Sequence, residues 1–342
     1  MLEVAVIGLS SLLVSYFGVA YLRGYAERRE ILDVPNERSS HDRPIPRGGG
    51  LAIALVSMIG LIIAWASHPT WTLSVFFAYL SGAVLISGVS WLDDLRSLPN
   101  RIRFSVHAIV SLILLAVIGY WSTVLLPGLG QLDLGWLGIL ITFFWIVGLI
   151  NAYNFMDGID GIAGGQGVIA GLGWTVLGWL SHQHLVTVLG LLSVTCSLGF
   201  LGHNWPPARI FMGDVGSAFL GYTFAALPVI AARNDPRLIL PAILLLWPFI
   251  FDTVFTFFRR LLKGENVFEA HRSHLYQRLI IAGYGHRFVT LLYSGLASAG
   301  LVLALIWYLK IKKSEVIVSL ALPLLCLGLW TFVTRQETTF TQ

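Results

Sequence analysis

Residues 238–258 read LILPAILLLWPFIFDTVFTFF, and they decide what kind of fold this chain adopts. A helix that crosses a membrane needs about 20 consecutive, mostly apolar residues. This stretch has 21 residues, and Asp252 is its only ionisable side chain. The stretch is therefore predicted to be a transmembrane helix.

The composition of the whole chain agrees with that prediction. Hydrophobic residues make up 56% of the 342 residues and charged residues 12%, whereas a soluble domain has about 45–50% and about 25%. With a mean hydropathy of +0.78, too few charges remain to solvate a globular surface. These values exclude a disordered chain, a secreted disulfide scaffold and a nucleic-acid-binding domain. They predict an all-α, polytopic membrane protein that forms a single domain over residues 1–342.

Similar apolar runs recur along the chain and give eleven predicted transmembrane helices. In chain order they are Val4–Leu22, Gly49–Ala66, Trp71–Trp91, Phe104–Trp121, Trp136–Ala152, Ile162–Leu180, Leu185–Leu201, Gly216–Ala232, Leu238–Phe258, Phe288–Tyr308 and Val316–Val333. The two cysteines, Cys196 and Cys326, both lie inside such runs. Buried free thiols are therefore expected, and not a disulfide or a metal pair.

The positive charges predict how these helices are oriented. When the loops are assigned alternately to two sides, 17 of the 22 Lys and Arg side chains fall on one side. By the positive-inside rule that side is cytoplasmic and the N-terminus is periplasmic. Basic residues follow the first run and do not precede it, which indicates a retained helix and not a cleaved signal peptide. The cluster Lys310–Lys313 falls on the other side, so the placement of the last two helices stays open.

The sharpest polar feature follows the fifth run and reads NAYNFMDGIDG from Asn151 to Gly161. Its four oxygen-bearing side chains recur every three residues, a spacing that places neighbours on nearly one face of a helical or 3₁₀ turn. They are Asn151, Asn154, Asp157 and Asp160. Short acidic side chains beside Gly and Asn are typical of a site for a hard cation. The alternative is a capped helix junction, with Asp160 as the N-cap of the next span.

Two further acidic motifs are predicted on the cytoplasmic side. Asp93 and Asp94 follow the third span, and adjacent carboxylates are best tolerated beside a cation or a basic group. The alternative is a solvated helix end in which an Asp pairs with Arg96. Asp214 lies between glycines at the start of the eighth span, as a ligand or as an ordinary cap. Asp252 is the one acid well inside an apolar run, which makes it a functional candidate.

A basic segment downstream of the ninth span provides groups for an anion. Residues 269–278 read EAHRSHLYQR. Arg binds phosphate bidentately, and His donates a hydrogen bond or moves a proton near neutral pH. The alternative is a basic interfacial segment that contacts lipid headgroups.

A second basic segment, residues 35–50, is rich in Pro and Gly and is predicted to be a shaped loop. His41 and Arg47 within it are candidate contacts for a phosphate, as are its glycine N–H groups. The alternative is a loop whose positive charges only set the topology.

Carboxylates, amides and Arg/His clusters at one membrane face suggest Mg²⁺ with a phosphorylated substrate, since Mg²⁺ is usually held by one or two carboxylates and the substrate's phosphates. The motifs resemble those of the polyprenyl-phosphate N-acetylhexosamine-1-phosphate transferases, a family that includes the phospho-N-acetylmuramoyl-pentapeptide transferase. The resemblance covers about residues 30–290. It rests on Asp93-Asp94, on residues 151–161, on FMGDVGS at 211–217 and on the histidine segment.

The resemblance implies a role for each motif, with Mg²⁺ or Mn²⁺ as the cofactor. Asp214 and Asp94 are the implied metal ligands. The implied catalytic residues are Asp93, Asp94, Asp157, Asp160 and His274. With the basic segments, the predicted substrate-binding residues are Asn151, Asn154, Arg272, His271, Arg47, His41 and Arg278. The chain has His274-Leu-Tyr-Gln277 where many relatives have further histidines, and this form resembles the branch that initiates O-antigen synthesis.

The reaction that the resemblance implies takes place at the bacterial inner membrane. N-acetylhexosamine-1-phosphate passes from a UDP-N-acetylhexosamine to undecaprenyl phosphate, and UMP leaves. A phosphate monoester is largely dianionic at pH 7, so direct attack is expected in preference to a covalent aspartyl intermediate. Residues 264–287 are too polar to span; they are a loop or an interfacial helix and the expected selector of the sugar. The family also implies a homodimer, and no nucleic-acid partner is expected.

Two other functions stay open. Transporters also have polar residues and broken helices within the membrane, but here the acids gather at one face and no inverted repeat is visible. In a transporter Asp157 and Asp252 would be reachable from both sides in turn, and in a transferase only from the cytoplasm. A non-catalytic lipid-binding scaffold is the third reading, and the complete set of acids argues against it.

Overall fold

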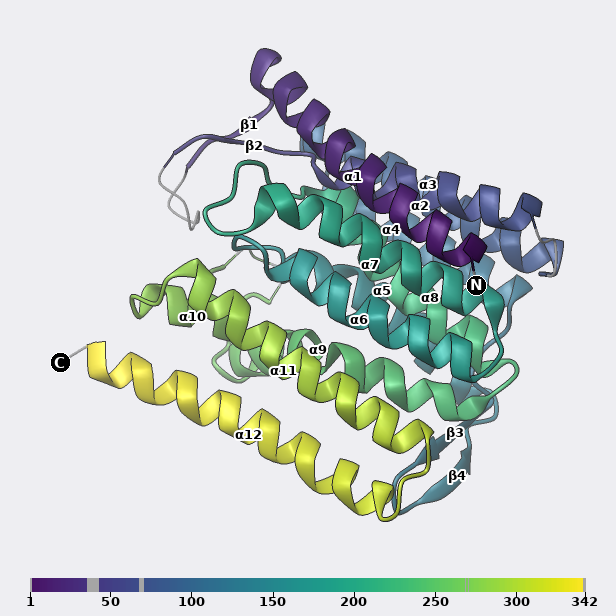
Figure 1. Ribbon diagram of the computed structural model, residues 1–342. Coiled ribbons are helices and arrows are strands. Elements are labelled where there is room, and N and C mark those ends of the chain that lie inside the picture. Colours follow the sequence, from purple (N-terminus) through teal and green to yellow (C-terminus); the bar gives the residue numbers. More distant parts are fainter. Residues whose placement is uncertain (1, 36–42, 68–70, 268, 270, 341–342) are drawn as a thin grey trace.

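The computed structural model describes residues 2–35, 43–67, 71–267, 269 and 271–340, and most of these residues are helical (Figure 1). The helices are α1 (Leu2–Arg28), α2 (Gly50–Ser67), α3 (Leu73–Arg96), α4 (Asn100–Val117), α5 (Leu137–Phe155), α6 (Ile162–Leu180), α7 (His184–Asn204), α8 (Asp214–Ala232), α9 (Ile239–Leu262), α10 (Leu275–Ile281), α11 (His286–Tyr308) and α12 (Ser314–Phe340). Two small antiparallel ribbons and one 3₁₀ turn complete the described structure: β1 (Leu32–Asp33) with β2 (Ile45–Pro46), β3 (Thr123–Leu126) with β4 (Gly130–Asp133), and η1 (Pro236–Leu238). The predicted all-α fold is confirmed.

Ten of the described helices are long and apolar enough to cross a membrane, so the chain is a multi-pass membrane protein. The prediction had eleven spans, and the difference is α6, in which several glycines and Gln166 lower the hydropathy. This helix has 19 residues and runs alongside α7 within the bundle (Figure 1). A Cβ on Gly171 of α6 would lie 2.9 Å from the main-chain oxygen of Gly190 in α7. The glycines of α6 therefore serve close helix packing.

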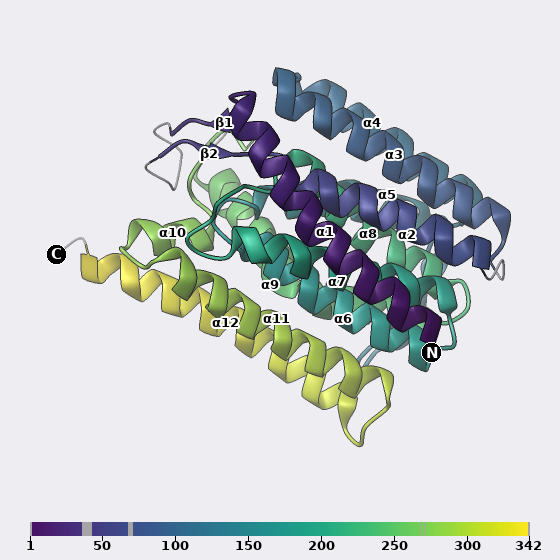
Figure 2. The ribbon, with the colours of Figure 1, turned by 45° about the horizontal axis from the view of Figure 1, so that its top comes forward.

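The centre of the bundle is α8. In its spanning window 94% of the residues are buried, against 28% in α1 and 17% in α12. Figure 2 shows α3 and α4 at one side of the bundle, and α11 and α12 at the opposite side. A Cβ on Gly50 of α2 would lie 2.3 Å from the Cα of Gly216, so α2 and α8 touch backbone to backbone. This contact fixes the first turn of α8, which carries Asp214, against the start of α2.

We expect Gly50→Ala to destabilise the fold, because the added methyl group would meet main-chain atoms of α8 that cannot rotate away. Overpacking of this kind costs about 1–3 kcal/mol. Gly88→Ala in α3 is the matched control, because nothing lies within 4 Å of a Cβ at that position. Thermal unfolding in detergent measures both variants against the parent chain, and equal midpoints for the two would contradict the close contact.

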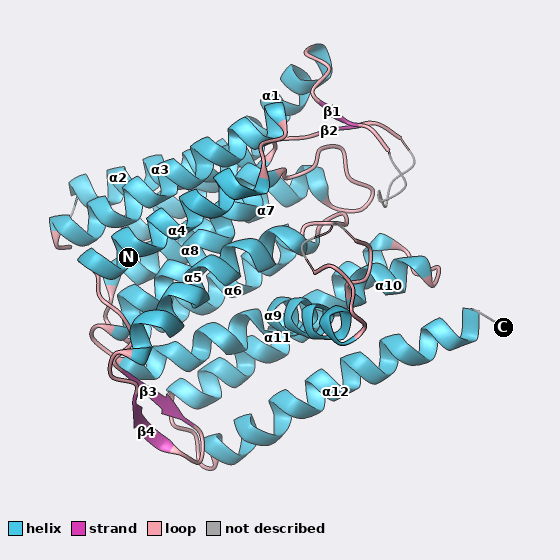
Figure 3. Ribbon diagram, turned by 180° about the vertical axis from the view of Figure 1, so that it is seen from behind, coloured by secondary structure: helices cyan, strands magenta, loops and turns pink. Residues whose placement is uncertain are grey.

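The polar motifs share one end of the bundle. The N-terminus and the β3–β4 ribbon lie at one end, and the β1–β2 ribbon, α10 and the C-terminus lie at the other (Figures 1 and 3). The alternating loops that the charge pattern assigned to one side therefore do meet at one end of the molecule. That this end faces the cytoplasm stays a prediction.

The end of α3 differs from the prediction. The third span was expected to stop at Trp91, with Asp93 and Asp94 beyond it, but α3 continues to Arg96. Ser97 then takes a left-handed conformation, with φ 50°, and Pro99 precedes α4. A proline disfavours helical geometry in the residue before it, so the chain turns here. The two carboxylates thus stand on the rigid last turn of a helix and not on a loop.

The C-terminal third of the structure answers two questions that the sequence left open, the conformation of residues 264–287 and the placement of the last two helices. Residues 264–287 contain the seven-residue helix α10, so the histidine segment is partly helical. The helices α11 and α12 are both formed, and α12 returns to the end of the bundle that carries α10 (Figure 1). Cys196 is a buried free thiol, as predicted, whereas Cys326 is a free thiol that is only half-buried.

Candidate active site

Asp94 joins the end of α3 to the beginning of α8. Its Oδ1 accepts from the main-chain N–H of Asp214 at 3.0 Å, and its Oδ2 from that of Val215 at 3.2 Å. These N–H groups have no partner within their own helix, so the carboxylate of Asp94 acts as a cap supplied by a distant helix. Gly213 has φ +74°, and a Cβ there would lie 2.7 Å from Asp94 Oδ2. The glycine before Asp214 is therefore required by both conformation and space.

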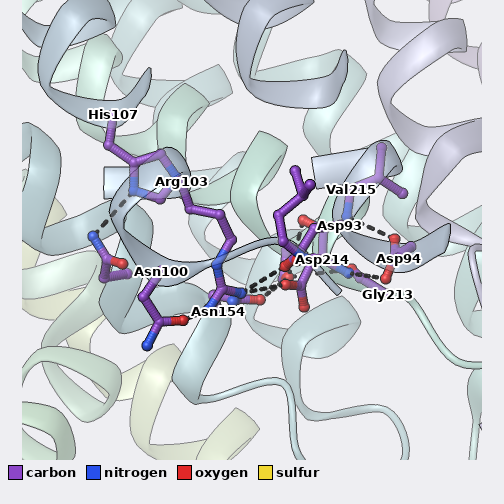
Figure 4. Close-up of polar contacts among 12 residues, drawn as sticks. Asp93, Asp94, Asn100, Arg103, His107, Asn154, Gly213, Asp214 and Val215 are labelled. Carbon is purple, nitrogen blue, oxygen red and sulfur yellow. Dashed lines mark hydrogen bonds and ion pairs between the residues drawn. The ribbon is translucent and has the colours of Figure 1, made fainter. Parts of the chain in front are cut away.

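Arg103 of α4 connects two of the predicted acids (Figure 4). Its Nη1 lies 2.7 Å from Asp93 Oδ2 and 2.7 Å from Asp214 Oδ2. Its Nη2 donates to Asn100 Oδ1 at 2.6 Å, which orients the guanidinium from within α4. The basic group that the sequence required beside Asp93 is thus Arg103, and not the neighbouring Arg96 of the alternative.

From the sequence, Arg103 was expected only to contribute to the topology. A signal for more was present, because Asn100, Arg103 and His107 are spaced three and four residues apart and lie on one face of α4. His107 is buried and lies beside α5, where Asn151 Nδ2 donates to its Nδ1 at 3.1 Å. A polar stripe on an otherwise apolar membrane helix is itself a mark of function.

A cavity of about 240 Å³ opens beside these acids. Its lining residues are Arg47, Asp93, Asp94, Ser97, Leu98, Arg103 and Asp214. Arg47 donates through Nη2 to the main-chain carbonyl of Asp94, so the loop before α2 closes one wall. Arg47 thus lines the same cavity as the acids, and its contact with a phosphate stays a prediction. His41, the other candidate of that loop, lies outside the described residues.

The four residues of the 151–161 motif do not all point to one place. Asn154 Oδ1 accepts from the hydroxyl of Ser217 in α8 at 2.6 Å, which holds the amide beside the first turn that carries Asp214. Asn151 instead faces α4, and its amide also donates to the main-chain carbonyl of Val147 at 2.7 Å. Ser217 was quoted in the motif but received no role from the sequence.

Asp157 lies in the turn between α5 and α6 and belongs to the acidic cluster. Burial of its carboxyl group, followed by the charges of Asp214, Asp94 and Asp160, raises its pKa to about 8. A carboxyl group that is destabilised by neighbouring carboxylates is ready to accept a cation or a proton. The electrostatics therefore place Asp157 with Asp94 and Asp214.

Asp160 is committed to structural contacts. Its Oδ2 accepts from the main-chain N–H of Ala208 at 3.0 Å, and its Oδ1 lies 3.2 Å from Nδ1 of His286. Its main-chain carbonyl accepts from the hydroxyl of Thr290 at 2.6 Å. The N-cap position of α6 is occupied by Gly161, with φ 77°, so the alternative that made Asp160 the cap of this helix is wrong. Asp160 instead ties the 205–213 loop and α11 to the turn after α5.

The histidine segment forms a second polar centre, built around α10. Nδ1 of the buried His274 lies 3.0 Å from Oδ1 of Asp252, the carboxylate inside α9. His271 lies next to it, with 5.0 Å between the two ring centroids. Burial, followed by the charges of His274 and Arg260, lowers the pKa of His271 to about 4. The imidazole of His271 is therefore neutral at pH 7.

The two predicted arginines of this segment have different surroundings. Arg278 is buried and forms a two-pronged ion pair with Glu337 of α12, so it fastens α10 to the C-terminal helix. Arg272 is half-buried and lies between His271 and Ser273. The substrate contacts predicted for the two arginines stay predictions.

No trio of His, Cys, Asp or Glu side chains in the described part of the chain is arranged to hold a metal ion by itself. Asp93, Asp94 and Asp214 converge, but protein donors already engage their oxygens. The arrangement suits a site in which one or two carboxylates act together with a phosphate-bearing substrate.

Comparison with known proteins supports the same chemistry. A profile of glycosyl transferase family 4 matches residues 76–232, which include Asp93, Asp94 and Asp214. A probable undecaprenyl-phosphate N-acetylglucosaminyl 1-phosphate transferase of Bacillus subtilis is 32% identical, over 84% of this chain and 80% of that protein.

Two further relatives come from other bacteria. A decaprenyl-phosphate N-acetylglucosaminephosphotransferase of Mycobacterium tuberculosis is 31% identical, over 85% of this chain and 79% of that protein. An undecaprenyl-phosphate alpha-N-acetylglucosaminyl 1-phosphate transferase of Yersinia pestis is 29% identical, over 84% and 81%. The chain therefore belongs to the polyprenyl-phosphate N-acetylhexosamine-1-phosphate transferases of glycosyl transferase family 4.

Proposed function

We propose that this protein transfers N-acetylglucosamine-1-phosphate from UDP-N-acetylglucosamine to undecaprenyl phosphate at the cytoplasmic face of the bacterial inner membrane. The observation that carries the proposal is the cavity in which Arg103 joins Asp93 to Asp214. Paired carboxylates and a guanidinium at the end of apolar helices suit a lipid phosphate that meets a nucleotide diphosphate. The names of the relatives support this acceptor class and this sugar.

The proposed reaction is one phosphoryl transfer. An oxygen of the lipid phosphate attacks the β-phosphorus of the UDP-sugar, and the bond from that phosphorus to the bridging oxygen breaks. UMP leaves with that oxygen, and the lipid carries the new diphospho-sugar. The attacking phosphate monoester has a second pKa of about 6, so it is largely dianionic at pH 7 and needs no strong base. We therefore favour direct attack over a covalent aspartyl intermediate.

The chain's own residues bind and orient the two phosphate groups. Arg47 and Arg103 line the cavity and supply positive charge to phosphoryl oxygens. Asn154 has its carbonyl oxygen engaged by Ser217, so its N–H groups are the part of the amide that faces other partners. Catalysis of phosphoryl transfer depends mainly on such positioning and on charge neutralisation.

The acidic residues of the cavity suit a divalent cation that is bound jointly by the protein and the substrate. Asp93 and Asp214 share one cationic donor, Nη1 of Arg103, and this arrangement supports the proposal that a positive centre can lie between them. Asp94 has both oxygens on the amides of α8, so we assign the metal-binding role to Asp214 with Asp93, and a positioning role to Asp94. Bound Mg²⁺ would neutralise charge on the diphosphate of the donor and on the UMP that leaves; Mn²⁺ would supply the same chemistry.

A transporter fits the arrangement less well. The acids gather at the end of the bundle that carries α10, and not at its midplane.

We further propose that the product initiates a cell-envelope polysaccharide of the O-antigen type. The support for this proposal is the form of the histidine segment.

The test uses the full chain in lipid nanodiscs with undecaprenyl phosphate, Mg²⁺ and a panel of UDP-N-acetylhexosamines. We expect UMP release with UDP-N-acetylglucosamine, its loss with EDTA, and its return when Mg²⁺ is restored. Release with only a different sugar would correct the donor. An absence of UMP with every donor, from folded protein, would overturn the transferase proposal.

A further inference from the structure

Asp252 of α9 is fully buried, yet its carboxylate is the most heavily hydrogen-bonded side chain of the second polar centre. Five donors reach it from three helices and from the residue before α10. They are Nδ1 of His274 at 3.0 Å, the main-chain N–H of Leu275 at 2.8 Å, the main-chain N–H of Tyr276 at 3.1 Å, the hydroxyl of Tyr293 at 2.6 Å and the hydroxyl of Thr256 at 3.2 Å. An acid inside a membrane helix is costly unless it is satisfied in this way.

The contact with His274 fixes the chemistry of its imidazole. A carboxylate only accepts hydrogen bonds, so Nδ1 of His274 must carry the hydrogen that points at Asp252. In a neutral ring the other nitrogen, Nε2, then has the free lone pair. Nδ1 is thereby committed to the protein, and Nε2 is the only ring nitrogen left to meet a substrate.

The same helix places that ring beside the acidic motif. The hydroxyl of Tyr276 donates to the main-chain carbonyl of Phe155 at 3.0 Å. A Cβ on Gly158 would lie 2.0 Å from that hydroxyl, so α10 is pressed against the turn that carries Asp157. The rings of His274 and Phe155 have centroids 6.3 Å apart. Asp252 thus holds both the ring and the helix that presents it.

We infer that Asp252 is a positioning residue for the transfer reaction: it sets the Nδ1–H tautomer of His274 and holds α10 so that Nε2 faces the substrate beside the Asn154–Asp157 turn. The role in the transfer reaction rests on the proposed function, whereas the tautomer of His274 rests on the geometry alone. It differs from a purely structural cap, because a cap would require the two amide contacts to Leu275 and Tyr276 but no particular proton on the histidine.

The first measurement needs no substrate. Full-length protein labelled with ¹⁵N-histidine in nanodiscs is compared with His274→Gln, which identifies the signals of that ring. Spectra are recorded over a series of rising pH until the neutral ring is observed, so that its tautomer can be assigned. We expect the Nδ1–H tautomer in the parent chain, and its loss in Asp252→Asn, whose amide can donate to Nδ1. An Nε2–H tautomer in the parent chain would overturn the inference, even if Asp252→Asn does not fold.

The second measurement is kinetic. At metal-binding histidines, removing the partner that orients the ring costs about 10- to 100-fold in affinity or activity, and we take the same range for His274. We expect Asp252→Asn to lose activity in that range, mainly in kcat. Tyr293→Phe is the matched structural control, because it removes a donor to the other carboxylate oxygen without touching His274. It should lower thermal stability as much and leave the tautomer unchanged.

The outcomes separate the two proposals. Equal losses of kcat and of stability in Asp252→Asn and Tyr293→Phe would reduce Asp252 to a structural cap and overturn the inference. Failure of the parent chain to release UMP from any donor would instead overturn the proposed function, and the histidine spectra would still decide the tautomer.

Discussion

Asp214→Asn is expected to lower kcat for UMP release by about 100- to 1,000-fold, the cost typical of removing one preorganised charge or dipole from an active site. The substitution keeps the size of the side chain but removes the charge that pairs with Arg103 and that we assign to the metal. The main-chain N–H of residue 214, which Asp94 caps, is unchanged, so α8 should still begin in place. Release of UMP at saturating donor and acceptor measures the effect.

Asp133→Asn is the matched control for this variant. Asp133 is an exposed acid in the β4 strand, at the opposite end of the bundle, and within the described part of the chain its side chain contacts only the N–H of Gly135. It should retain the activity of the parent chain. If Asp214→Asn released UMP within a few-fold of the parent rate, the assignment of Asp214 to the reaction would be wrong.

Arg103→Ala is expected to have the second largest effect, a loss of about 100-fold in kcat, because it leaves Asp93 and Asp214 facing each other without their shared cation. Arg103→Lys should recover only part of the activity, since an ammonium group keeps the charge but cannot reproduce the fixed fork of a guanidinium. The same UMP assay measures both variants, at several Mg²⁺ concentrations.

Arg101→Ala controls for the loss of a positive charge from α4, because Arg101 is exposed on the same first turn and lies outside the cavity. It should stay close to the parent rate. A double variant, Arg103→Ala with Asp93→Asn, should lose less than the sum of the two single effects, since the two side chains contact each other. Simple additivity would show that the pair does not act as a unit.

The sequence predicted the fold well because membrane helices obey a local rule. Each apolar run of sufficient length became a helix, including the last two, whose basic connection at Lys310–Lys313 had left them open. The ends were less accurate. Trp91 was expected to close the third span because the residues after it are polar, but the helix continued through Asp93 and Asp94. Polar residues indicate where the chain leaves the membrane, whereas Pro99 indicates where the helix must have ended.

The sequence predicted residues of the candidate site but not which of them contact one another. Regular spacing suggested that Asn151, Asn154, Asp157 and Asp160 act together, yet Asn151 faces α4 and Asp160 faces α11. Only tertiary packing decides which face of a turn meets which helix. The contact of Asp94 with Val215 joins residues 121 positions apart, and no local pattern encodes it.

Arg103 and Asp252 are two residues whose contacts could not be predicted from the sequence. Arg103 was one arginine among many that set the topology, and its pairing with two acids depends on a neighbouring helix. Asp252 was correctly singled out as an acid inside an apolar run, but its hydrogen-bond donors come mainly from residues 274–276 and from Tyr293. Its surroundings therefore required the folded chain.

The cap that Asp94 provides to α8 has a consequence for biosynthesis. The carboxylate is made 120 residues before the first amide that it binds. At about 5–20 residues per second, a ribosome needs roughly 6 to 24 s to supply the partner. During that interval Asp94 lacks the two main-chain donors of α8, although Arg103, which pairs with Asp93, is already made. The end of the molecule that carries the candidate active site is thus completed late, and a chain that stalls between α4 and α8 carries Asp93 and Asp94 without the first turn of α8.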